Sequence, residues 1–162
     1  MKAIVQMPDQ VLRRTAALVP AADIKGKKIQ SLLEEMKAAI HREEDAVAIA
    51  APQLGASVRI FAVSKKISKK YEHDLIFINP EIIRLGKQKK VMQEGCLSVR
   101  WKYGDVKRAT TASVRALNAE GNEFVVNGRG LLAQIFQHEV DHLNGILFID
   151  TAKNIHDLPP EK

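Results

Sequence analysis

Apolar side chains recur every three or four residues in two segments of the chain, which is the spacing of a helix with a buried face. Between Gly26 and Glu44 they form a single stripe, so we predict a helix that packs on a core through that stripe. Its members are Ile29, Leu32, Leu33, Met36 and Ile40. The second segment begins after Gly130 and ends near Gly145. Its apolar positions surround the helix on more than one side and predict a buried helix; they are Leu131, Leu132, Ile135, Phe136 and Leu143.

The other apolar segments are short and separated by turn residues, which is typical of β-strands. We predict strands over residues 47–51, 58–63, 75–85, 90–93, 106–117 and 123–127. Gly86 would join the third and fourth strands as a pair, and residues 118–122, Asn-Ala-Glu-Gly-Asn, would make the last two a hairpin. Neighbouring strands and few helices predict an α+β fold, in which antiparallel strands enclose the second helix.

The composition changes this picture little. The chain has 162 residues, of which 46% are apolar and 27% charged, so we expect one domain over residues 1–150 and a short C-terminal tail over residues 151–162 that frays at its end. No segment approaches the roughly 20 apolar residues of a membrane span. The N-terminus contains no readable signal or transit peptide, so a cytoplasmic protein with no membrane partner is expected.

The charge balance is basic, because 25 Lys and Arg residues against 19 Asp and Glu residues give a net charge of +6. Lysines cluster over residues 65–70 and again over residues 87–90. Such clusters are usually solvated loops. If they gather in space they could instead meet an acidic partner, and we expect no sequence-specific nucleic-acid binding from them.

The second predicted helix contains His138-Glu139-Val140-Asp141-His142, an H-E-x-x-H arrangement. Residues four apart on a helix turn through about 400°, so both imidazoles project from one face and could hold one divalent metal ion. Glu139 lies one position round, where a general base for a water molecule should stand. An ordinary exposed polar face is the alternative, but the apolar surroundings of this helix disfavour it.

Two histidines leave a catalytic site of this kind one protein ligand short. The chain has Gly145 where the longer metzincin motif has its glycine, but Phe148 where that motif has a third histidine. Asp150 and His156 remain candidates by spacing. Cys96 is the only cysteine, so it cannot form an internal disulfide, and its thiolate would be a soft, strong metal ligand.

Two further segments bear on this choice. Cys96 lies in Glu94-Gly95-Cys96-Leu97-Ser98, where Gly95 permits close backbone approach and the N–H of Leu97 could face the metal. Upstream, residues 46–53 read Ala-Val-Ala-Ile-Ala-Ala-Pro-Gln, a run of small residues that ends in the amide side chain of Gln53. Alone, this run indicates no more than a buried strand followed by a turn.

Together, in this order, these three segments resemble the signature motifs of the peptide deformylases. Residues 94–98 and 137–142 match the second and third motifs, and residues 46–53 match the first except at Ala46 and Ala48, where the family has glycines. The resemblance extends from about residue 9 to residue 150. It implies that Cys96, His138 and His142 are the metal ligands. It also implies that Glu139 is the catalytic acid and base, while Gln53 and the Leu97 N–H stabilise the oxyanion.

The resemblance further implies a cofactor and a substrate. The cofactor would be one divalent ion, expected to be Fe²⁺, with Zn²⁺, Ni²⁺ or Co²⁺ able to replace it. The substrate would be an N-formylmethionyl peptide or a nascent chain, and the products would be formate and a free N-terminal amine. Longer members of the family carry a basic C-terminal helix that can dock on the ribosome. Only residues 154–162 follow here, so we expect at most a weak ribosome contact through the basic surface.

Several residues are expected to support this site. We expect five residues to form an apolar wall for the methionine side chain: Val47, Ala48, Ile49, Ile135 and Phe136. They could equally belong to the hydrophobic core. We expect Arg108 to pair with one of two nearby acids, Glu94 or Asp141, and so to brace the metal-bearing segments. The loop at residues 100–103, Arg-Trp-Lys-Tyr, departs from the family, which more often has proline at position 100. Its substrate contacts therefore cannot be transferred.

Two other functions remain open from the sequence. One is a metallopeptidase built on the same H-E-x-x-H motif, which would cleave peptides with a free amine. The other is a deformylase-like protein that has lost activity and serves as a basic binding module. The intact Cys96, Glu139 and two histidines disfavour the second, whereas Ala46 and Ala48 favour it.

Overall fold

The structure is a computed structural model that describes residues 1–161, and it consists of two antiparallel sheets and two α-helices. The helices are α1 (Lys27–Arg42) and α2 (Leu131–Leu143). The strands are β1 (Ala48–Ala50), β2 (Ile60–Val63), β3 (Leu75–Leu85), β4 (Lys89–Gly95), β5 (Lys102–Ala109), β6 (Thr111–Leu117), β7 (Glu123–Arg129) and β8 (Lys153–Asp157). Short 3-10 turns occupy Gln10–Arg13, Ala21–Asp23, Ala51–Leu54, Lys65–Ile67 and Phe148–Asp150.

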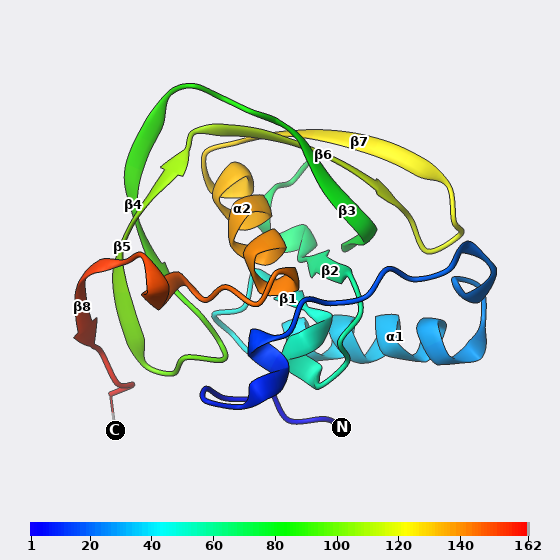
Figure 1. The fold of residues 1–162 in the computed structure, drawn as a ribbon, viewed down its shortest axis with the longest axis horizontal. Coiled ribbons are helices and arrows are strands. Elements are labelled where there is room, and N and C mark those ends of the chain that lie inside the picture. The colour runs from blue at the N-terminus through cyan, green and yellow to red at the C-terminus, as the bar shows by residue number, and fades with distance from the viewer. Residues whose placement is uncertain (162) are drawn as a thin grey trace.

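The two sheets enclose α2. One sheet has the strand order β1-β2-β3-β6-β7 and the other has the order β4-β5-β8, with all neighbours antiparallel. Figure 1 shows α2 in the middle of the molecule, with β4 and β5 on one side, β3, β6 and β7 arching over it and α1 below. The predicted α+β fold with a central helix is therefore confirmed.

The strand pairing differs from the prediction around Gly86. β3 and β4 do not pair with each other, because β3 pairs with β6 and β4 pairs with β5. The predicted strand over residues 106–117 is likewise divided between β5 and β6, which belong to different sheets. The β3–β4 and β5–β6 connections both pass from one sheet to the other. They meet where the Gly86 N–H donates to the Thr111 carbonyl oxygen over 2.9 Å. A side chain at position 86 would overlap the Thr111 hydroxyl, so glycine is required by this close approach.

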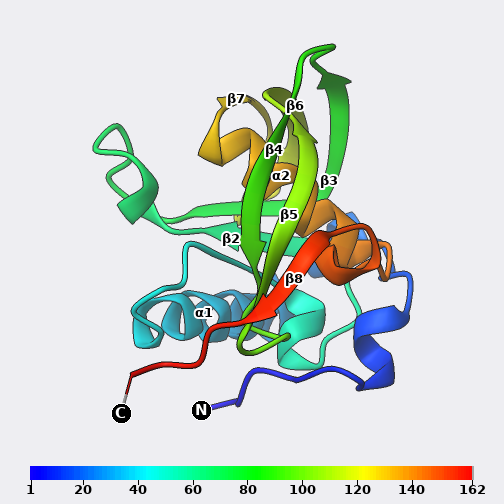
Figure 2. The same ribbon diagram turned by 90° about the vertical axis from the view of Figure 1, so that its left-hand side faces the viewer.

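Part of the segment that the sequence indicated as a tail forms a strand. β8 pairs with β5, and Figure 2 shows it at the edge of the smaller sheet. All five of its residues are exposed, so no apolar periodicity marked it in the sequence. The 118–122 hairpin between β6 and β7 agrees with the prediction, since Asn118 donates to Asn122 and their strands pair in register.

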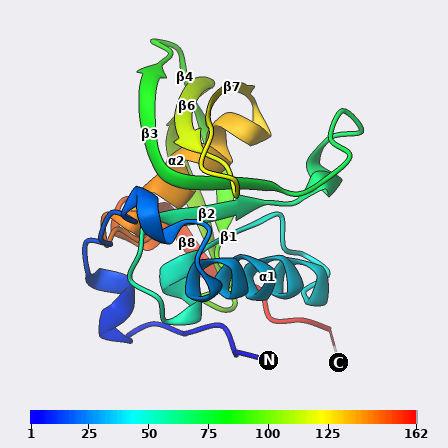
Figure 3. The same ribbon diagram turned by 90° about the vertical axis from the view of Figure 1, so that its right-hand side faces the viewer.

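The core lies on both sides of the larger sheet. The predicted stripe of α1 is buried and packs beneath the sheet, as Figure 3 shows from the side. On the other side Phe136 of α2 meets Phe61 and Phe77, whose rings stack with centroids 4.5 Å apart. Replacing such a buried aromatic by alanine typically costs about 3–5 kcal/mol, so this cluster fixes the position of α2. No helix in the described part of the chain is long and apolar enough to cross a membrane.

Candidate metal centre

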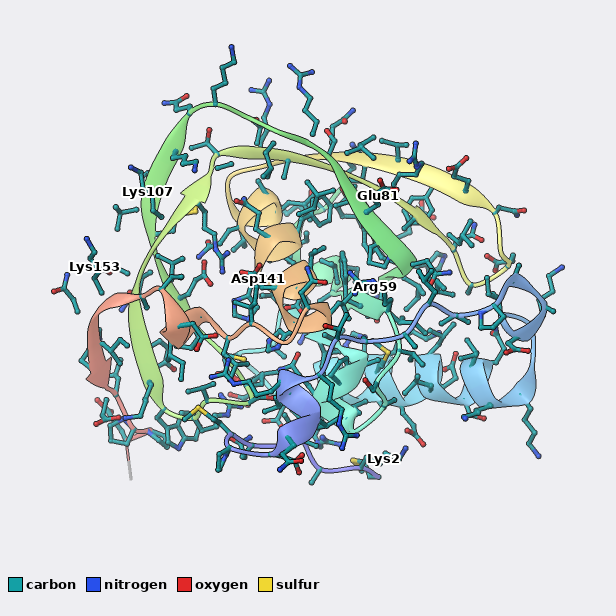
Figure 4. The ribbon with its side chains drawn as sticks, viewed as in Figure 1. Lys2, Arg59, Glu81, Lys107, Asp141 and Lys153 are labelled. Atoms are coloured by element: carbon teal, nitrogen blue, oxygen red, sulfur yellow. The ribbon has the colours of Figure 1, made fainter. Side chains whose placement is uncertain are left out.

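The H-E-x-x-H motif lies on the last two turns of α2. His142 and Glu139 are 1% and 4% exposed, and the rings of His138 and His142 have centroids 4.9 Å apart, on one face of the helix. In Figure 4 the neighbouring Asp141 is labelled on α2, inside the arch of strands, while Lys107 and Lys153 point away from the molecule. His142 is therefore buried, whereas His138 is half-buried and lines a cavity.

Cys96 completes a group of three donors. It follows the last residue of β4, and its Sγ lies 3.3 Å from His142 Nε2. One ligand atom from each of Cys96, His138 and His142 lies within 4.8 Å of the other two. Tetrahedral coordination places N and S donors about 3.5 Å apart. The spacing, together with the soft sulfur and two imidazoles, fits one divalent ion of the zinc or iron type.

The ionisation of Cys96 favours the same use. Burial alone would raise the pKa of its thiol, but the neighbouring His142 and His138 outweigh burial and bring that pKa well below its usual value. The thiolate is the form that binds a metal. Asp150 and His156, which spacing left open as third ligands, lie elsewhere: Asp150 pairs with Arg13, and His156 is on exposed β8.

Glu139 is buried beside these donors without contributing to the group. Its Oε2 has no hydrogen-bond partner among the described residues. Burial raises its pKa, while the adjacent His138 and His142 lower it, and the net shift is upward. A carboxyl group with a raised pKa and a free oxygen can accept a proton from a water molecule and return it.

Arg108 contacts both of the acids between which the sequence could not choose. Its Nε and Nη2 form two hydrogen bonds to Glu94, of 2.7 and 2.8 Å, and its Nη1 donates to Asp141 Oδ2 over 2.7 Å. Glu94 Oε1 in turn lies 2.8 Å from His138 Nδ1, which leaves His138 Nε2 for a metal. Burial alone would raise the pKa of Glu94, but the hydrogen bonds from Arg108 and His138 hold it at about 2. The pair therefore stays ionised and links β4, β5 and α2.

Gln53 and Leu97 come from two other segments, the Ala51–Leu54 turn and the loop after β4. The Gln53 Oε1 accepts from the Ala50 N–H over 2.9 Å, which turns its Nε2 towards Ser98 Oγ at 3.1 Å and Cys96 Sγ at 3.7 Å. Leu97 follows Cys96 directly. Both residues line a cavity of about 240 Å³ that also reaches Cys96, His138 and Glu139.

The apolar wall of this cavity includes some of the expected residues and not others. Val47, Ala48 and Ile135 line it, as does Ala46. Ile49 and Phe136 are fully buried in the two core clusters and do not line it. Ile49 faces away because side chains alternate along β1, so Ala48 and Ile49 point to opposite faces. Phe136 instead packs on Phe61 and Phe77.

Sequence reasoning missed Gln134. Its Nε2 donates to the Gln93 carbonyl oxygen over 3.0 Å and to Glu94 Oε2 over 3.3 Å, and its side chain lines the cavity. The available signal was its spacing, because Gln134 precedes His138 by four residues and so shares its helix face. It fastens the start of α2 to the end of β4.

Comparison with known proteins gives one consistent result. A family model described as polypeptide deformylase matches residues 1–157. The peptide deformylase of Halothermothrix orenii is 44% identical over 147 residues, covering 91% of this chain and 90% of that protein. The peptide deformylase of Desulforudis audaxviator is 38% identical over 156 residues, covering 94% of each.

A solved structure agrees with these relatives. The class I type b peptide deformylase from Acinetobacter baumannii, with Met-Ala-Ser bound, has 32% sequence identity and a TM-score of 0.84. The alignment covers 92% of this chain and 96% of that one. The shared motifs, the donor group and these nearly complete matches have one explanation: the chain belongs to the polypeptide deformylase family.

Proposed function

We propose that this site hydrolyses the formamide bond of N-formylmethionyl peptides, with Cys96, His138 and His142 holding one divalent ion. The observation that carries the proposal is the position of Glu139, which is buried beside a Cys-His-His donor group and lines the cavity. One of its oxygens has no hydrogen-bond partner in the described part of the chain. Membership of the deformylase family supports the substrate.

A divalent ion in this site would supply Lewis-acid chemistry, lowering the pKa of a water molecule and polarising the formyl carbonyl. Glu139 takes a proton from the water at its carboxylate as the water oxygen bonds to the formyl carbon. It delivers that proton to the amine nitrogen as the C–N bond breaks, which leaves formate and a free amine. The Gln53 Nε2 and the Leu97 N–H donate to the formyl oxygen as negative charge develops there, and losing one such donor typically costs on the order of 3 kcal/mol in the transition state. Val47, Ala48 and Ile135 give the methionine side chain an apolar wall.

The proposed native ion is Fe²⁺, with Zn²⁺, Ni²⁺ or Co²⁺ as functional replacements. Anaerobic purification followed by metal analysis tests the identity of the ion. If it is iron, activity should decay in air and persist after Co²⁺ or Ni²⁺ replacement. Equal lifetimes in air and under argon would contradict an iron enzyme.

Formate release from formyl-Met-Ala-Ser by the metal-loaded protein tests the activity. The matched substrate Met-Ala-Ser has the free amine, and its cleavage would indicate the competing metallopeptidase. Release of formate without peptide cleavage is the expected result. Cys96→Ser should bind metal weakly, because the variant replaces a soft ligand by a hard one. Full metal content after dialysis against a weak chelator would point to another third ligand.

A cytoplasmic location and a weak ribosome contact belong to the same proposal, since the substrate is a new polypeptide. Four exposed cationic residues at the bend between β3 and β4, which we call the basic bend, form no ion pair within the described chain; they are Arg84, Lys87, Lys89 and Lys90. Figure 4 shows side chains that end in nitrogen projecting from this bend. Charge reversal of the three lysines should reduce co-sedimentation with ribosomes at low salt. Unchanged binding would remove the basic bend from the contact.

A further inference from the structure

The carbonyl groups at the C-terminal end of α2 need partners from outside the helix, because the last four carbonyl oxygens of a helix have none within it. Residues 140–142 find theirs nearby, since the N–H groups of residues 144–146 donate back to them. The carbonyl oxygen of Leu143, the last residue of α2, instead accepts from two distant parts of the chain, the Ala16 N–H over 2.9 Å and the side chain of Arg59. Other segments therefore hold the last turn of α2, which carries the second histidine of the H-E-x-x-H motif.

Arg59 reaches this helix end from a fixed position directly before β2. Its N–H donates to the Ala17 carbonyl oxygen over 2.8 Å, and its own carbonyl oxygen accepts from the Asn79 N–H over 2.8 Å. From this base its Nη1 donates to the Leu143 carbonyl oxygen over 3.0 Å. Figure 4 labels Arg59 beside the lower end of α2, inside the arch of strands. The Arg59 side chain thus links a backbone segment held on both sides to the end of the metal-bearing helix.

The positive charge of Arg59 has no carboxylate partner in the part of the chain that the structure describes. Other arginines do pair with acids; they are Arg13, Arg42, Arg100, Arg108 and Arg115. Arg59 is half-buried, and burial lowers its pKa. A cation that loses water without gaining a counter-ion costs free energy. The end of α2 offsets part of this cost, because the helix dipole places about half a negative elementary charge there.

The two histidines of the donor group are oriented by different means. His138 Nδ1 lies 2.8 Å from Glu94 Oε1, so a neighbouring side chain fixes its ring. His142 Nδ1 is buried and has no hydrogen-bond partner within residues 1–161. The second nitrogen of a metal-binding imidazole usually makes such a bond, which sets the orientation of the ring. Because His142 lacks this partner, the direction of its ring depends more on the backbone of the last turn of α2.

We propose that Arg59 positions His142 for metal binding, because it holds the last turn of α2 through the Leu143 carbonyl oxygen. This inference rests on the proposed metal-binding function of the Cys-His-His donor group. Arg59 lies outside the lining of the cavity, so it is a positioning residue and not a catalytic one. The tolerance for movement of a ligand is small, since metal–ligand distances vary by only about 0.2 Å. Loss of Arg59 should therefore weaken and distort the metal site of a folded protein.

Binding of Co²⁺ tests the proposal without turnover. Arg59→Met removes both the donor and the charge, and we expect its Kd for Co²⁺ to rise by about tenfold, the lower end of the loss when a metal ligand loses its support. The visible absorption of the bound Co²⁺ should change as well, because it depends on the geometry of the ligands. Arg59→Lys keeps the charge and one donor on a shorter side chain, so its Kd should rise only about threefold. Anaerobic competition with a chelator measures each Kd.

The matched control is Arg13→Met, which should bind Co²⁺ like the wild type. Arg13 pairs with Asp150 and donates to the Gly145 carbonyl oxygen over 3.4 Å, but none of its side-chain hydrogen bonds in the described chain goes to α2. A wild-type Kd and spectrum in Arg59→Met, even with a lower melting temperature, would show a merely structural role and overturn the proposal. If Arg59→Met does not fold, the same result in Arg59→Lys overturns it. Co²⁺-loaded wild type that releases no formate would reject the proposed activity and leave the role of Arg59 intact.

Discussion

Glu139 combines deep burial with one carboxylate oxygen that has no hydrogen-bond partner within residues 1–161. It does not belong to the donor group, so its removal should separate metal binding from proton transfer. We predict that Glu139→Ala keeps its metal but loses formate release by at least about a hundredfold, the usual range for a general acid and base. Metal analysis and a formate assay on the same sample check this. Normal turnover by metal-loaded Glu139→Ala would show that another group moves the proton.

Ala46 and Ala48 occupy positions where the family has glycine, and both line the cavity. Positive φ cannot be the reason for glycine here, because the only non-glycine residues with positive φ in the described chain are Asn79 and Asn154. The remaining reason for glycine at positions 46 and 48 is the space that a methyl group would take in the cavity. Ala48 belongs to β1, keeps 8% of its surface exposed and is the nearer of the two to Gln53 in the chain.

We therefore predict that Ala48→Gly raises kcat/KM on formyl-Met peptides and that Ala46→Gly does less. The melting temperature should change little, because glycine in place of a strand alanine costs about 1 kcal/mol at most. Both variants would be compared with the wild type on a formylated tripeptide and on formyl-Met. An unchanged or lower kcat/KM for Ala48→Gly on both substrates would mean that the methyl group does not obstruct the cavity.

At the scale of elements, residues 5–7 hydrogen-bond to the backbone beside both proposed oxyanion donors, Gln53 and Leu97. The Val5 N–H donates to the Gln53 carbonyl oxygen over 2.8 Å, and the Met7 N–H donates to that of Ser98 over 2.9 Å. Between them, the Gln6 Nε2 donates to the Leu97 carbonyl oxygen over 2.7 Å. The orientation of the Leu97 peptide groups thus depends on a segment that does not line the main cavity.

We predict that Gln6→Ala lowers kcat by about three- to tenfold, in line with a hydrogen bond worth about 0.5–1.5 kcal/mol. Metal content should remain close to wild type, because the donor group is intact. Gln10→Ala is the control, since Gln10 is also an exposed glutamine of this region but makes no such contact. Equal kcat in the two variants would show that Gln6 does not position Leu97.

The elements that could be predicted are those encoded by local periodicity. Both helices follow from apolar spacing, and the placement of His138 and His142 on one face follows from helix geometry alone. The strand pairing around Gly86 could not be predicted, because it depends on which distant strand each segment meets. For the same reason the contacts of Gln6 and Arg59 had no signal, since they join residues separated by 91 and 84 positions. Cys96 was one of several candidates until its motif was compared with a family.

At the scale of the whole molecule, the Glu94–Arg108–Asp141 group joins both strands beside the metal centre to α2. Glu94 is 5% exposed and Arg108 8% exposed, so water solvates neither charge well. Removing one member of such a group is strongly destabilising, because it leaves an uncompensated buried charge. The acid stability of the protein should therefore depend on Glu94.

The sign of that dependence follows from its pKa, which is about 2 in the folded protein against an ordinary value of 4.5. A depressed carboxylate pKa stabilises the fold fully above pH 4.5, and this contribution is lost as the pH falls from there towards 2. Over the whole interval it amounts to on the order of 3 kcal/mol.

We predict that the free energy of unfolding of metal-free wild type falls more steeply below pH 4.5 than that of metal-free Glu94→Gln, which has no carboxyl group to titrate there. Urea titrations at several pH values would measure both, and metal-free samples are needed because acid also protonates Cys96 and the two histidines. Parallel decreases in the two proteins would show that other carboxylates dominate the acid unfolding and that the Glu94 pair contributes little.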